Sequence, residues 1–127
     1  MTSTQTTTIL VVEDDAYIRT AVTMLLRNTG YQVVSVASGE DALSIASRAD
    51  LILMDIELGY GIDGVEAAGL ILEVRDVPIV FRSNTVDPDT IRRARAIAGE
   101  FLLTKTDDDL KLLSCVQSAL SVRADSI

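Results

Sequence analysis

Five short apolar runs, each followed by a helical pattern, constrain the fold of this chain more than any other feature. The runs are Ile9–Val12, Val33–Ala37, Leu51–Met54, Ile79–Phe81 and Phe101–Leu103. Runs that are apolar on both faces indicate strands covered by helices on both sides, which is typical of a parallel sheet. The sequence therefore predicts an α/β protein with a (βα)5 doubly wound, five-stranded parallel sheet.

Helix signals fill the segments between these runs. Ser38 opens a capping-box-like start of a second helix. Asp87-Pro88 supplies an N-cap and a first-turn proline for a fourth helix, Asp89–Ala98, which ends at Gly99. The residues expected to face inward on the last helix are Leu110, Leu113, Val116 and Leu120.

Composition excludes several classes of function. The chain carries 11 Lys+Arg against 19 Asp+Glu, and this net charge of −8 argues against a nucleic-acid or anionic-membrane surface. It has no histidine and a single cysteine, Cys115, which excludes imidazole-based catalysis, internal disulfides and Cys-cluster metal sites. Any chemistry must therefore use carboxylates, hydroxyls, Lys and Arg.

The chain shows no targeting signal, repeat or linker. Its start lacks a basic region, and no run approaches the roughly 20 apolar residues of a membrane span. With 127 residues, it is expected to be cytoplasmic and to hold one domain over residues 9–127 after a short polar tail over residues 1–8.

Polar residues follow four of the predicted strands. They are Glu13 and Asp14 after the first strand, Asp55 after the third, Ser83 and Asn84 after the fourth, and Lys105 after the fifth. In a doubly wound sheet the ligand site lies beyond the carboxyl ends of the strands, so these side chains should share one rim. With strand order 2-1-3-4-5 the first and third strands are neighbours about 4.8 Å apart, so Asp14 and Asp55 should converge.

Such a cluster can bind a metal and a phosphoryl group. Carboxylates this close repel one another unless a cation lies between them, and an all-oxygen set suits Mg²⁺. Lys105 and the hydroxyl of Ser83 can contact phosphoryl oxygens, and a carboxylate such as Asp55 can accept the group. Taken singly, each residue has an ordinary explanation as a helix cap, a turn residue or a strand-end charge. Their alignment on one rim favours a site.

At these positions the chain resembles the receiver domain of bacterial two-component response regulators, which has a CheY-like, flavodoxin-like fold. The segments that carry the resemblance are ILVVEDD, DLILMDIEL, PIVFRSN and FLLTK. The resemblance implies that Asp55 is the phosphoacceptor. The implied Mg²⁺ ligands are Glu13, Asp14, Asp55 and the backbone carbonyl of Glu57. The implied phosphoryl-binding and switch residues are Ser83, Asn84 and Lys105.

The resemblance also implies partners. A sensor histidine kinase or phosphotransfer protein would donate the phosphoryl group, and a downstream protein would read the modified surface, without direct DNA or membrane binding. Such a domain is a signalling module and no enzyme, although it promotes its own phosphoryl transfer and dephosphorylation. Arg92, Arg93 and Arg95 form a basic patch on the fourth helix, where the family docks partners or dimerises. The patch can equally be a solvated helix face.

The chain departs from the family pattern at several positions. Gly59 replaces the usual proline after the phosphoacceptor, and the loop that it begins is one residue longer. Thr106 replaces the proline after Lys105, which predicts a trans peptide bond there. Leu102 stands where the family carries an aromatic residue, and Phe101 should point to the other face of its strand. Arg82 is expected to face outward beside the fourth helix.

Two other functions remain open at this point. The departures fit a degenerate receiver that binds proteins without being phosphorylated, which the absence of Mg²⁺-dependent labelling at Asp55 would favour. Asp55-Ile-Glu57 also faintly resembles the Asp-x-Asp motif of haloacid-dehalogenase-like phosphohydrolases. Turnover of a small phosphate ester would support that alternative, but 127 residues barely allow the further motifs and cap of such an enzyme.

Overall fold

The computed structural model describes residues 6–125, in which strands and helices alternate. In chain order they are β1 (Thr8–Val12), α1 (Ala16–Asn28), β2 (Gln32–Val36), α2 (Gly39–Ile45), β3 (Leu51–Asp55), α3 (Gly64–Val74), β4 (Ile79–Ser83), α4 (Pro88–Ala98), β5 (Leu102–Thr104) and α5 (Asp109–Asp125). A 3-10 turn over Ala46–Arg48 follows α2. Strand β1 thus begins one residue before the first predicted apolar run.

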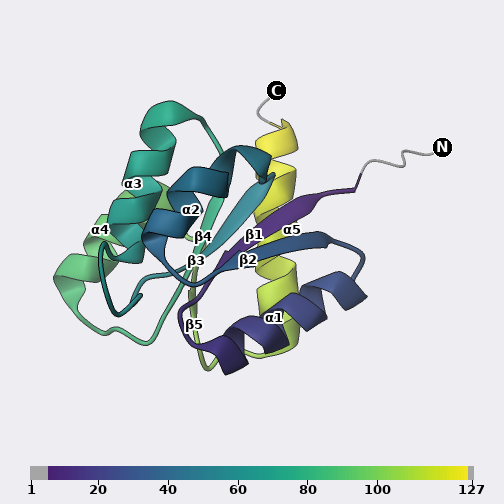
Figure 1. Cartoon of the computed structure of the whole chain (residues 1–127), viewed down its shortest axis with the longest axis horizontal. Coiled ribbons are helices and arrows are strands. Elements are labelled where there is room, and N and C mark those ends of the chain that lie inside the picture. Colours follow the sequence, from purple (N-terminus) through teal and green to yellow (C-terminus); the bar gives the residue numbers. More distant parts are fainter. Residues whose placement is uncertain (1–5, 126–127) are drawn as a thin grey trace.

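All strand pairs are parallel, and the order across the sheet is β2-β1-β3-β4-β5. The predicted (βα)5 doubly wound sheet is therefore confirmed. Helices α2, α3 and α4 cover one face, and α1 and α5 cover the other (Figure 1). Among residues 6–125 no helix is both long and apolar enough to cross a membrane.

The central strand β3 fixes the position of the site because all five of its residues are buried. Ile52 and Met54 pack toward α2, α3 and α4, whereas Leu51 and Leu53 pack toward α1 and α5. Burial on both faces prevents the strand from sliding, since a shift of one residue would exchange its two faces. Asp55, the last residue of β3, is thereby held at the carboxyl rim of the sheet.

Side-chain caps start the helices immediately beyond that rim. Asp15, Ser38, Asp63 and Asp87 each accept a hydrogen bond from the backbone N–H three residues on. The caps predicted at Ser38 and Asp87 are confirmed, and α4 ends at Gly99, whose φ of 61° suits glycine. Short loops from strand to cap therefore gather polar residues at this end of the sheet.

Two predicted side-chain orientations are wrong. Leu110 is 77% exposed, whereas the other three predicted residues of α5, Leu113, Val116 and Leu120, do pack against the α1/α5 core, together with Leu112 and Ala119. Arg82 is only 8% exposed. It alternates with Phe81, which faces α4, so it shares the α1/α5 face with Val80.

Candidate functional site

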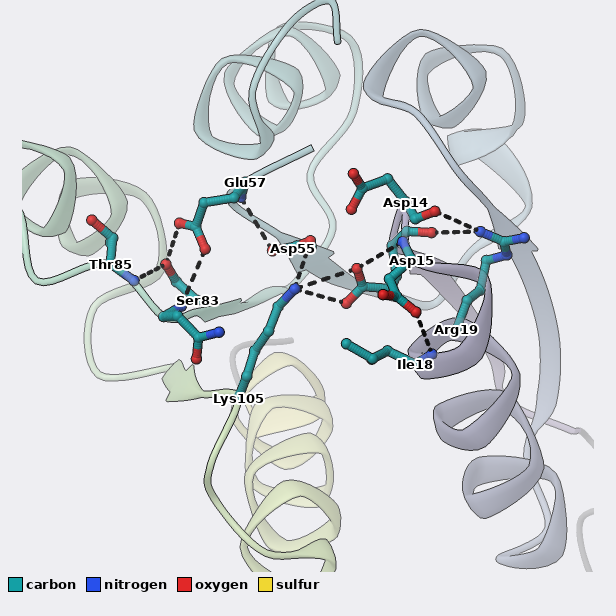
Figure 2. A network of polar contacts seen from close by, with 11 residues as sticks. Asp14, Asp15, Ile18, Arg19, Asp55, Glu57, Ser83, Thr85 and Lys105 are labelled. Carbon is teal, nitrogen blue, oxygen red and sulfur yellow. Dashed lines mark hydrogen bonds and ion pairs between the residues drawn. The ribbon is translucent and has the colours of Figure 1, made fainter. Parts of the chain in front are cut away.

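Three carboxylates meet at the carboxyl rim between β1 and β3. Glu13, Asp14 and Asp55 each offer an oxygen atom within 4.8 Å of the others. Glu13 and Asp55 are each only 2% exposed, whereas Asp14 is exposed to solvent. Neighbouring parallel strands thus bring together acids that are far apart in the sequence (Figure 2).

Lys105 reaches this cluster from the far side of the sheet, beyond β5. Its Nζ lies 3.0 Å from Oδ2 of Asp55 and 3.1 Å from Oε1 of Glu13. The Lys105 side chain is itself only 14% exposed, so water screens these ion pairs weakly. One ammonium group therefore faces two buried carboxylates, with the third acid, Asp14, beside them.

Burial and charge shift the proton affinities of this pair. Burial is the largest cause that raises the pKa of Asp55 to about 7; Glu13 adds to the rise, and Lys105 opposes it. For Lys105, burial lowers the pKa, but hydrogen bonds and charge from Asp55 and Glu13 outweigh burial and raise it above its ordinary value. The ionised site thus carries more negative charge than Lys105 balances.

The donor set fits a hard divalent cation. All three ligands are carboxylate oxygens, two are buried, and Lys105 leaves part of their charge uncompensated. Mg²⁺ favours oxygen ligands and keeps several waters, which the exposure of Asp14 to solvent permits. Glu57 lies two residues beyond Asp55, in the loop after β3, and its backbone carbonyl stays a predicted ligand.

Arg19 braces the acidic turn after β1, a contact that sequence reasoning missed. Its guanidinium donates to the carbonyl of Glu13 at 2.8 Å and is 3.4 Å from that of Asp14. The backbone N–H of Asp15 donates to Oε2 of Glu13 at 3.2 Å. The sequence signal for this contact is the position of Arg19 in the first turn of α1, about one helical turn after the two acids.

A second cluster lies beside Asp55 and joins the ends of β3 and β4. The Ser83 hydroxyl, which is buried, donates to Oε2 of Glu57 in a close contact. The backbone N–H of Asn84 donates to Oε1 of the same carboxylate at 3.1 Å. The Thr85 N–H in turn donates to the Ser83 hydroxyl at 2.9 Å. Sequence reasoning considered only the backbone carbonyl of Glu57 and missed its side chain.

The loop from β3 to α3 follows the edge of the acidic cluster. Gly59 and Gly61 have φ values of 74° and 76°, which proline cannot adopt and which favour glycine. A Cβ at Gly59 would lie 2.9 Å from Oδ2 of Asp14. The replacement of the family proline by Gly59 is therefore explained by the conformation of the longer loop.

The remaining predicted residues lie outside these two clusters. Arg92, Arg93 and Arg95 are exposed on α4. Arg92 pairs with Asp89 in the same helix, and Arg93 lies 3.6 Å from Asp63, the N-cap of α3. These ion pairs neutralise part of the patch.

Two predictions about β5 and its loop are confirmed. Leu102 packs on the α4 side of the sheet, whereas Phe101 packs with the α1/α5 core. No peptide bond within the described residues is cis, so the Lys105–Thr106 bond is trans. The aromatic position of the family is therefore filled by an aliphatic side chain.

The fold and the rim define a class: doubly wound α/β domains whose acidic cluster and lysine lie at the carboxyl end of the sheet. The profile of the response regulator receiver domain matches residues 9–117 of this chain. The chain belongs to this family, the receiver domain of two-component response regulators.

Three relatives place the chain within the family. It is 32% identical over 116 residues to the transcriptional regulatory protein PdtaR of Mycobacterium tuberculosis, covering 89% of this chain and 56% of the relative. The N-terminal domain of a response regulator/sensory box/GGDEF protein from Carboxydothermus hydrogenoformans is 32% identical, with a TM-score of 0.85 over 94% of this chain and 98% of that one. The BeF3-activated receiver domain of Klebsiella pneumoniae RstA is 28% identical, with a TM-score of 0.80 over 89% and 97%. The chain spans about half the length of PdtaR.

Proposed function

We propose that this receiver domain accepts a phosphoryl group on Asp55 in a Mg²⁺-dependent reaction. The observation that carries the proposal is the position of Asp55, which ends the buried central strand and contacts Lys105 at 3.0 Å. The acids Glu13 and Asp14 lie within metal-binding distance of the same carboxylate. This combination of a fixed carboxylate, a cation and a metal-binding acid pair suits phosphoryl transfer.

In the proposed reaction a carboxylate oxygen of Asp55 attacks the phosphorus of a phosphohistidine in another protein. The bond from phosphorus to the imidazole nitrogen breaks, and its electron pair leaves with the imidazole. Lys105 then binds one phosphoryl oxygen, and Ser83 and the N–H of Asn84 offer donors to another. Bound Mg²⁺, held by Glu13, Asp14, Asp55 and the carbonyl of Glu57, would neutralise phosphoryl and carboxylate charge.

Because the chain has no histidine, its phosphodonor must be a separate group, on a sensor histidine kinase or a phosphotransfer protein. We propose that phosphorylation then biases a surface that a downstream protein reads, without direct contact to DNA or a membrane. The exposed face of α4, which carries Arg92, Arg93 and Arg95, is the proposed surface for that partner or for a second copy of the chain. We further propose that the domain works in the cytoplasm.

The test is intact mass after incubation with acetyl phosphate, with and without Mg²⁺. A carboxylate oxygen of Asp55 would displace acetate from phosphorus, so we expect a single phosphoryl adduct that requires Mg²⁺. The adduct should be absent from Asp55→Asn and present in the matched variant Asp50→Asn, which removes an acid at the opposite end of β3. A folded chain that gains no adduct would contradict the proposal and favour the degenerate binding module.

A further inference from the structure

The carboxylate of Glu57 is bound by two donors that suit a phosphoryl group. The Ser83 hydroxyl and the Asn84 N–H each donate to a different oxygen of this carboxylate. The Ser83 hydroxyl has one proton to donate, and it donates that hydrogen bond to Glu57. The Thr85 N–H in turn donates to the oxygen of the same hydroxyl. Neither donor is free to bind a second anion while Glu57 remains in place.

The site of phosphoryl transfer is directly adjacent. The backbone N–H of Glu57 donates to Oδ1 of Asp55 at 3.1 Å, and the other oxygen of Asp55 faces Lys105. In Figure 2 the Glu57 carboxylate lies between Asp55 and Ser83. A phosphoryl group on Asp55 has three oxygens to satisfy, and Ser83 and Asn84 offer donors at the end of β4, the strand that pairs with β3 beside Asp55.

The binding of Glu57 is weak enough to be reversed. Its carboxylate is exposed to solvent, and within residues 6–125 no Lys or Arg forms an ion pair with it. Only two neutral donors retain it, and water can satisfy it when it leaves. An arriving phosphoryl group carries about two negative charges. It would therefore compete for the same donors and also repel the carboxylate.

We infer that Glu57 is a built-in anion that occupies the phosphoryl-binding donors of the unmodified chain and must be displaced before they can bind phosphoryl oxygens. The inference rests on the proposed function, since it concerns the same reaction at Asp55. Displacement would also release Glu57, which lies near the start of the loop that runs past Asp14 through Gly59. Phosphorylation is thereby coupled to a rearrangement of this loop.

Two variants separate occupancy of the donors from simple charge repulsion. Glu57→Asp keeps the negative charge but is one methylene too short for the contact, whereas Glu57→Gln removes the charge and keeps the reach. Charge repulsion alone would therefore speed labelling in Glu57→Gln and leave Glu57→Asp at the parental rate, which would overturn the inference. If occupancy limits the reaction, Glu57→Asp should gain the adduct from acetyl phosphate and Mg²⁺ roughly tenfold faster than the parent, as expected for the loss of hydrogen bonds to a charged group. Glu100→Gln, an exposed charge change on a loop at the amino end of the sheet, is the matched control and should label at the parental rate.

A second measurement reports the contact without any phosphoryl transfer. In ¹⁵N NMR spectra of the metal-free chain, the Asn84 amide should shift in Glu57→Asp and stay in place in Glu100→Gln. An unmoved Asn84 amide, or parental labelling by Glu57→Asp, would overturn the inference while leaving phosphorylation of Asp55 intact. If the parent and every variant fail to label, the proposed function fails, and the competition with it, even where the amide shift confirms the contact.

Discussion

At the scale of single residues, the protonation of Asp55 sets the behaviour of the site. The carboxyl group is 2% exposed, and its pKa of about 7 lies well above the ordinary value of 3.8. Burial and the nearby Glu13 favour the neutral acid, and Lys105 only partly offsets them. The nucleophilic, ionised form of Asp55 is thus costly in the metal-free chain, and an added cation would lower that cost.

This raised pKa predicts a pH-dependent difference between the parent chain and Asp55→Asn. The native state binds the Asp55 proton more tightly than the unfolded state. Its contribution to the free energy of unfolding is therefore fully present below about pH 4 and is lost as the pH rises toward about 7. Asparagine does not titrate. With a chelator present, the free energy of unfolding of Asp55→Asn relative to that of the parent should therefore increase by on the order of 2 kcal/mol between pH 4 and pH 8.

Thermal melts of both chains across this range measure that difference. Asp41→Asn, which neutralises an exposed acid in the first turn of α2, serves as the control and should show no trend over the same window. A gap between Asp55→Asn and the parent that stays constant with pH would contradict a raised pKa at Asp55.

At the scale of elements, the approach of α3 to the end of β3 depends on one glycine. Gly64 is the first residue of α3, and its N–H donates to the carbonyl of Ile56 at 2.9 Å. A Cβ at Gly64 would lie 2.1 Å from the backbone oxygen of Asp55 and 2.9 Å from Cα of Ile56. These are backbone atoms, so any side chain at Gly64 must move the helix or the phosphoacceptor strand.

We therefore expect Gly64→Ala to lower the free energy of unfolding by about 2 kcal/mol or more, as overpacking in a well-packed core does. The matched variant is Gly69→Ala in the same helix, where a Cβ meets no atom within 4 Å. It should stabilise the chain by about 0.5–1 kcal/mol, because alanine loses less backbone entropy than glycine. Urea denaturation distinguishes the two, and equal stability of both variants would refute the close contact.

Element types and helix starts could be predicted from the sequence because their signals are local. The caps at Ser38 and Asp87 and the stop at Gly99 each depend on neighbouring residues in the chain. The inward face of α5 was predicted only in part. Leu113, Val116 and Leu120 pack toward the core as expected, but Leu110 is exposed, and the packing of the helix on the sheet also buries Leu112 and Ala119.

The sequence predicted those parts of the candidate site whose positions follow from the strand order. Asp55 ends β3 and Lys105 directly follows β5 in a doubly wound sheet, so their convergence follows from strand order. The Glu57 carboxylate follows a strand by two residues, and its direction depends on loop dihedrals that no periodic pattern encodes. Its contact with Ser83, 26 residues further along the chain, belongs to the tertiary structure alone.

At the scale of the whole molecule, acidic residues outnumber basic ones, whereas the outer face of α4 carries three exposed arginines. The chain has a net charge of −8, and two of the three arginines on this helix already contact carboxylates. A partner that docks there would compete with Asp89 and Asp63 for these guanidinium groups. The face therefore offers weaker electrostatic attraction than its three arginines would provide if unpaired.

The site also links distant parts of the molecule, which predicts that metal binding stabilises the entire fold. Glu13 follows β1, Asp55 ends β3 and Lys105 follows β5, so the cluster exists only when the sheet is assembled. A ligand that binds only the native state raises the free energy of unfolding with its concentration. At pH 8, millimolar Mg²⁺ should accordingly raise the free energy of unfolding by on the order of 1 kcal/mol, and the melting temperature should rise with it.

Two neighbouring acids test whether this stabilisation comes from the cluster. Asp14→Asn removes a proposed ligand, so its melting temperature should respond little to Mg²⁺. Asp15→Asn makes the same change of charge one residue away, where the side chain caps α1 through the N–H of Ile18 and asparagine can replace it. It should retain the full response. An equal response in both variants would show that Mg²⁺ acts through general screening of the acidic surface, because only a specific site distinguishes Asp14 from Asp15.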